Sequence, residues 1–159
     1  MKNWAFYLAA VLGFGIYGAV TDADRDGSGA IIGEGSVDAF NVRVGDCFND
    51  YSTSSFSDEV SSVPGVPCSE PHDNETYAVF DVSISSYPES EDVMAEIAHN
   101  ACVERFDAFV GRDYESSALD ISTLFPTAQS WKQNDREVVC AVYDMEANPL
   151  VGSVQGKGL

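Results

Sequence analysis

The densest group of side chains that could do chemistry lies at His72, Asp73 and Glu75. A histidine beside carboxylates can act as a general base, and it can also bind a metal ion. However, no third ligand follows at metal-binding spacing, and the sequence has no GxSxG nucleophile motif. Because Cys68 and Pro71 come just before, we favour a structural interpretation in which His72 and Glu75 bond backbone groups of a disulfide-held turn. His72 and Glu75 are kept as candidate binding residues.

A second acidic group lies nearer the amino terminus, where Asp22, Asp24 and Asp26 precede a glycine as in the first half of a calcium-binding loop. The twelfth position of such a loop is normally Glu, but here it is Gly33, and Glu34 comes one residue late. No amphipathic helix follows. These aspartates are therefore a calcium candidate of low expected affinity, and the alternative is an acidic, glycine-rich spacer.

Four cysteines, Cys47, Cys68, Cys102 and Cys140, occur without any CxxC spacing. A thioredoxin-type redox site and a zinc knuckle both lack their motif. In an exported domain, two structural disulfides are then expected. Cys102 falls on the apolar arc of a predicted helix and Cys140 on one face of a predicted strand, so packing brings this pair together. The sequence therefore predicts the disulfides Cys47–Cys68 and Cys102–Cys140.

Trp131 is the remaining candidate binding residue, and Asp135 and Arg136 follow it closely. A tryptophan can line a ligand pocket, because its ring offers a large apolar surface and one hydrogen-bond donor. We favour a core or lid position for Trp131 and a turn at Asp135–Arg136 before the next strand.

The charge of the chain excludes one class of partner. Among 159 residues there are 26 Asp plus Glu and only 8 Lys plus Arg, which gives a formal net charge of -18. Such a chain is repelled by nucleic-acid phosphates, so nucleic-acid binding is excluded. Hydrophobic residues make up 45% of the chain, which is enough for one packed domain. No cofactor motif is present, and we expect no cofactor.

The amino-terminal segment indicates the location of the protein. Residues 4–20 carry no charge, and as a helix they would extend about 25 Å, slightly less than the roughly 30 Å hydrocarbon core. We predict a membrane anchor at residues 1–20, a flexible acidic linker at 21–36 and one extracytoplasmic domain at 37–159. The alternative is a signal peptide cleaved near residues 21–23, which leaves a secreted domain.

Hydrophobic periodicity predicts one long helix at residues 90–110, with Ser90 as its N-cap and Gly111 just after its end. Alternation predicts strands at 76–84 and 137–143, and in the first of these Ala78 faces one way and Tyr77 the other. Prolines place 63–66 at a sheet edge, and 151–154 is a candidate last strand. The fold class is therefore α+β, with one main helix packed on a mostly antiparallel sheet.

Several short blocks occur in a defined order along the chain. They are VGDCF (44–48), VPCSEPHDNE (66–75), AC (101–102), FPT (125–127), SW (130–131), DR (135–136), VC (139–140) and GS (152–153). This ordered set resembles the septum formation domain of actinobacterial envelope proteins. The resemblance covers about residues 42–156, and Asn134 stands where the family usually has Gly. It implies an extracytoplasmic, membrane-attached protein without an established chemistry.

We therefore expect a membrane-anchored, non-enzymatic envelope protein that binds an envelope or cell-division protein. Two alternatives stay open. One is an envelope hydrolase that uses His72 with Glu75 or Asp73. The other is a calcium-responsive module that uses the acidic loop at residues 22–26.

Overall fold

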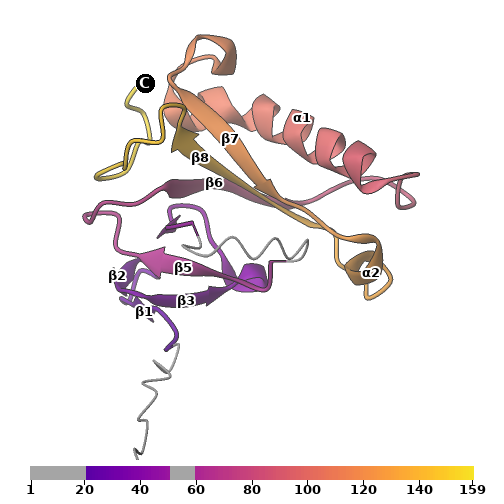
Figure 1. The fold of residues 1–159 in the computed structure, drawn as a ribbon, viewed down its shortest axis with the longest axis horizontal. Helices are drawn as coiled ribbons and strands as arrows, with labels where there is room; N and C mark the ends of the chain where they lie inside the picture. The colour runs from indigo at the N-terminus through magenta and orange to yellow at the C-terminus, as the bar shows by residue number, and fades with distance from the viewer. Residues whose placement is uncertain (1–20, 51–59) are drawn as a thin grey trace, which may run out of the picture.

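A computed structural model describes residues 21–50 and 60–159 of the chain. The predicted membrane anchor at residues 1–20 lies outside these described residues. Within them, no helix is both long enough and apolar enough to cross a membrane. The fold is α+β, as predicted, with a long helix on one side of an antiparallel sheet (Figure 1).

The main sheet has six strands, and every neighbouring pair is antiparallel. The predicted strand at 63–66 is not at an edge, because it lies between two other strands of the sheet. The strands, in spatial order, are β3 (Gly35–Asp38), β5 (Ser62–Val66), β4 (Cys47–Phe48), β6 (Asn74–Asp81), β8 (Glu137–Asp144) and β7 (Leu119–Leu124).

Helix α1 (Glu91–Val110) begins and ends where its sequence predicts. The Ser90 hydroxyl accepts a hydrogen bond from the Val93 amide, and Gly111 adopts a left-handed conformation with φ of 82°. Buried residues recur along α1 every four positions, at Met94, Ala98, Cys102 and Phe106, so one stripe of the helix faces the sheet. Figure 1 shows α1 lying across β7, β8 and β6.

A bulge in β6 changes the predicted alternation. Thr76 pairs with Ala141 and Ala78 pairs with Cys140, so Tyr77 is an extra residue without a register partner. As a result, Tyr77 joins Ala78 in the core under α1 instead of facing the other way. There its hydroxyl donates a 2.8 Å hydrogen bond to the Cys102 carbonyl.

The opposite face of the sheet carries a second, smaller core, which includes Val37, Val63, Val139 and Ala141. Ile31 also belongs to this core, although it lies in the segment predicted to be a flexible linker. Residues 21–36 instead contain the hairpin strands β1 (Asp24–Arg25) and β2 (Ile31–Gly33) and the beginning of β3. The linker prediction was wrong because burial of Ile31 holds this Gly- and Asp-rich segment against the domain.

The predicted last strand at 151–154 is not a strand. Leu150, just before this segment, forms an isolated bridge with His72, and residues 151–159 contain no strand. The remaining short elements are η1 (Ala39–Asn41), η2 (Tyr114–Ser116) and α2 (Ala128–Trp131).

Candidate functional site

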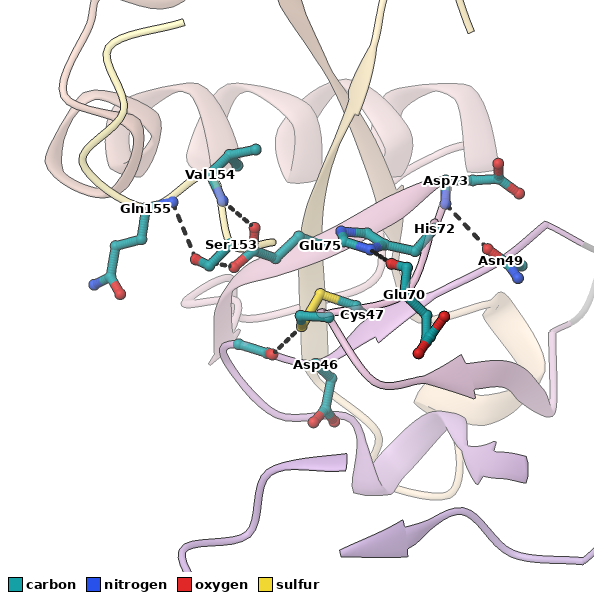
Figure 2. Close-up of a disulfide and its surroundings, with 12 residues drawn as sticks. Asp46, Cys47, Asn49, Glu70, His72, Asp73, Glu75, Ser153, Val154 and Gln155 are labelled. Atoms are coloured by element: carbon teal, nitrogen blue, oxygen red, sulfur yellow. Dashed lines mark hydrogen bonds between the residues drawn. A yellow bond between two sulfur atoms is a disulfide. The ribbon is translucent and has the colours of Figure 1, made fainter. Parts of the chain in front are cut away.

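Two places in the described structure gather side chains that could bind or react. The first, which we name the motif cluster, consists of Cys47, Cys68, His72, Glu75 and Ser153. Cys47 on β4 pairs directly with Glu75 on β6, and the disulfide Cys47–Cys68 joins β4 to the turn after β5 (Figure 2). Both predicted disulfide pairings are confirmed.

Glu75 is 1% exposed, and both of its carboxylate oxygens accept hydrogen bonds from the carboxyl-terminal segment. The Ser153 hydroxyl donates to Oε1 and the Val154 amide donates to Oε2, both at 2.6 Å. Such charge-assisted bonds stabilise the ionised carboxylate in a buried position. The family blocks at 66–75 and 152–153, which lie far apart in the sequence, therefore meet at Glu75.

His72 is also buried, with 1% of its surface exposed. Its Nδ1 lies 2.8 Å from the Glu70 carbonyl oxygen. A carbonyl oxygen can only accept, so Nδ1 carries a proton, and in the neutral ring Nε2 then presents a lone pair. Within the described part of the chain, Nε2 has no hydrogen-bond partner. His72 thus bonds the backbone of its own turn, whereas Glu75 bonds the distant carboxyl-terminal segment and not the turn. One imidazole nitrogen of His72 remains without a partner among the described residues.

Asp73 is the third member of the predicted catalytic group, and its bonds go to residues outside the motif cluster. Its carboxylate accepts a hydrogen bond from the Asp50 amide at 2.9 Å, and its own amide donates to the Asn49 side chain at 3.1 Å. Asp73 therefore joins the end of β4 to the start of β6, and Figure 2 shows it turned away from Glu75.

The three aspartates of the calcium candidate have separate roles. The Asp26 carboxylate accepts hydrogen bonds from the Ser28 amide, the Ser28 hydroxyl and the Ala30 amide, so it closes the β1–β2 turn. Asp24 lies in β1, and Asp22 forms an isolated bridge with Ser36. In residues 21–50 and 60–159, the one group of His, Cys, Asp or Glu with converging ligand atoms is Cys47, His72 and Glu75.

The second place is a hollow of about 310 Å³ that we name the acidic groove. Its lining residues come from η1 and the residue before it, from residues 60–61, from the start of α1, and from the stretch between the end of β7 and the first part of β8. A neighbouring hollow shares Phe40, Ser130, Asp135 and Glu137 with it. The acidic groove is lined by the acids Asp38, Glu91, Asp135 and Glu137 and by the apolar residues Phe40, Val60, Leu124, Phe125 and Val139, among others.

Phe40 and Val60 are exposed on the wall of the groove, at 61% and 41% of their surfaces. Burial raises the pKa of Glu137, and repulsion by Asp135 and Asp81 raises it further. The groove therefore combines apolar contact area with closely spaced negative charge. The sequence alone does not reveal the groove, because its lining residues come from four separate segments. The one local indication of a binding surface in the sequence was Phe40, an aromatic residue in a polar stretch.

Trp131 lies beside the acidic groove and does not line it. Its ring packs against Tyr87, with 5.7 Å between centroids, and the guanidinium carbon of Arg136 lies 3.4 Å from its centroid. Asn134 has a φ of 72°, which is the conformation that a glycine at this position would adopt freely. Trp131 and Arg136 thus build the rim of the turn before β8.

The motif cluster and its disulfide belong to a small α+β domain in which the most distinctive sequence blocks are brought together by folding. A family model described as septum formation matches residues 44–158, most of the described chain. The chain belongs to this septum formation family, as the sequence blocks indicated. No curated protein and no solved structure matches the chain.

Proposed function

We propose that this chain is a binding protein of the cell envelope that acts in septum formation and holds a partner in its acidic groove. Membership of the septum formation family supports the septal part of the proposal. The observation that carries the binding part is the groove itself, which is lined by four carboxylates, by apolar residues and by the exposed ring of Phe40.

The chemistry of the groove favours one kind of partner. Arg136 is the one cation among the described lining residues of the two hollows, and its guanidinium is stacked on Trp131. A protein segment that carries lysine or arginine beside apolar side chains would neutralise the carboxylates and cover Phe40 and Val60. We therefore propose a basic, partly apolar segment of an envelope or division protein as the partner.

Location outside the cytoplasm is part of the same proposal. Two disulfides join cysteines that are mostly buried, and such bonds persist in oxidising compartments. An anchor at residues 1–20 would hold the domain at the membrane, where a growing septum is reached by lateral diffusion.

The septal role is tested in the cells that produce the chain. Deletion of the gene should lengthen cells or misplace septa, and a fluorescent fusion should concentrate at division sites. A normal septum pattern, with the fusion spread evenly over the envelope, would contradict the proposal.

A further inference from the structure

We propose that the motif cluster is a metal site that opens when its disulfide is reduced, with Cys47, His72 and Glu75 as ligands of Zn²⁺. This inference concerns a different place from the acidic groove and does not rest on the septal role. One ligand atom from each of the three side chains lies within 4.8 Å of the others, and all three side chains are buried.

The histidine is already oriented as a metal ligand. Metal-binding histidines generally donate their second ring nitrogen to a carbonyl or carboxylate, which sets the tautomer and aims the lone pair. Here Nδ1 donates to the Glu70 carbonyl, and the buried Nε2 has no partner among the described residues. A buried polar atom without a partner costs free energy, and a metal ion would use its lone pair.

The disulfide controls the site because only a thiolate is a strong ligand. A dithiol reductant donates two electrons to the Cys47–Cys68 bond and itself closes to a disulfide, and its two protons leave Cys47 and Cys68 as thiols. Binding of Zn²⁺ then releases the Cys47 proton to solvent. Thiolate, imidazole and carboxylate together suit zinc, with water or Cys68 in the fourth tetrahedral position.

The positions of the ligands do not depend on the disulfide alone. The Gly45 amide donates to the Thr76 carbonyl and the Thr76 amide donates to the Asp46 carbonyl, both at 2.8 Å, so β4 stays beside β6. His72 is held by two backbone bonds to Leu150, at 3.0 and 2.7 Å. Glu75 accepts one bond on each oxygen and keeps further lone pairs for a metal.

The test uses the full-length chain with Cys68→Ser, which leaves Cys47 as a thiol beside His72 and Glu75 and keeps the second disulfide. We expect this variant to bind one Zn²⁺, and with Co²⁺ to show a thiolate-to-metal charge-transfer band. Cys47→Ser is the matched control, because it breaks the same disulfide but removes the central ligand. Adding His72→Ala to Cys68→Ser should weaken zinc binding by about 100-fold or more, since even outer-sphere partners contribute 10- to 100-fold.

Equal zinc affinity of Cys68→Ser and Cys47→Ser, or no effect of His72→Ala, overturns the proposal. A second measurement applies even where Cys68→Ser folds poorly. The wild-type chain is reduced with a phosphine, and its melting temperature is recorded with and without Zn²⁺. We expect zinc to raise the melting temperature of the reduced wild type and not that of reduced His72→Ala. An equal response of the two contradicts the site.

Discussion

Three carboxylates of this acidic chain, the buried Glu75 and Asp46 and the partly exposed Glu137, have three different environments. Glu75 receives an amide and a hydroxyl donor. Asp46, which is 3% exposed, forms a two-pronged ion pair with Arg25 at 2.6 and 2.7 Å. Glu137 instead faces Asp135 and Asp81, which raise its pKa after burial has done so. The first two carboxylates have hydrogen-bond donors or a cation beside them, whereas the pKa of the third is raised and its ionised form is disfavoured in the folded state.

This difference predicts how stability responds to pH at Glu137. A raised pKa means that the folded state binds the proton more tightly than the unfolded state, so this contribution is complete at low pH and is lost as pH rises through the folded-state pKa. Glu137→Gln should therefore raise the melting temperature at neutral pH. The gain should disappear below the ordinary glutamate pKa of 4.5, where the wild type is protonated in both states.

Thermal melts from pH 3 to pH 8 measure this effect, with exposed Glu89→Gln as a control. A melting temperature of Glu137→Gln that stays below that of the wild type at neutral pH would contradict the account.

At the residue scale, sequence reasoning recognised chemistry that is local in the chain. The backbone bond of His72 and the disulfide pairs could be predicted, because the relevant partners are set by nearby prolines or by one helix face. The amide and hydroxyl donors to Glu75 could not, because Ser153 and Val154 lie 78 and 79 positions away. No local pattern reports such a contact.

Among the elements, α1 and β8 could be predicted from the sequence, because each has many residues that follow one hydrophobic period. Strand β4 has only two residues, Cys47 and Phe48, and its place is set by pairing on both sides. The bulge at Tyr77 could not be predicted either, because one added residue changes the side of the sheet to which Tyr77 points without changing the local composition.

The two disulfides join different kinds of element, and we predict unequal effects of breaking them. They span 21 and 38 positions, so loop entropy gives each about 3 to 4 kcal/mol. Cys102 and Cys140 lie in the apolar core between α1 and β8, where a serine hydroxyl finds no polar side chain of the motif cluster. Cys47 is surrounded by His72 and Glu75, which can accept from a hydroxyl.

Cys102→Ser should therefore lower the free energy of unfolding more than Cys47→Ser does, by about 1 to 3 kcal/mol for the buried unpaired hydroxyl, and so give the lower denaturant midpoint. Equal midpoints for the two variants would refute this ranking and leave the pairing unchanged.

At the scale of the whole molecule, the net charge is -18, and four of the acids line the acidic groove. Composition predicts that nucleic acid is not a partner, but it cannot show that four acids line one groove. That arrangement needs η1, position 60, the start of α1 and the α2–β8 turn to meet, which happens only after the sheet has formed. The hairpin at residues 21–36 was missed for the same reason, because Ile31 finds its core on distant strands.

The acidic groove as the septal binding surface is the central claim, and one comparison in dividing cells tests it most directly. A groove variant carries Asp38→Asn, Glu91→Gln and Glu137→Gln. A matched control carries Glu104→Gln, Asp107→Asn and Glu115→Gln, which are exposed elsewhere. Both variants lose three negative charges, and both are expressed as fluorescent fusions at equal levels in cells lacking the wild-type chain.

The measured quantity is the ratio of septal to lateral fluorescence, with the melting temperature of each purified variant recorded alongside. We predict that the groove variant loses its enrichment at the septum and that the control keeps it. Equal enrichment of both folded variants would show that the groove does not hold the septal partner.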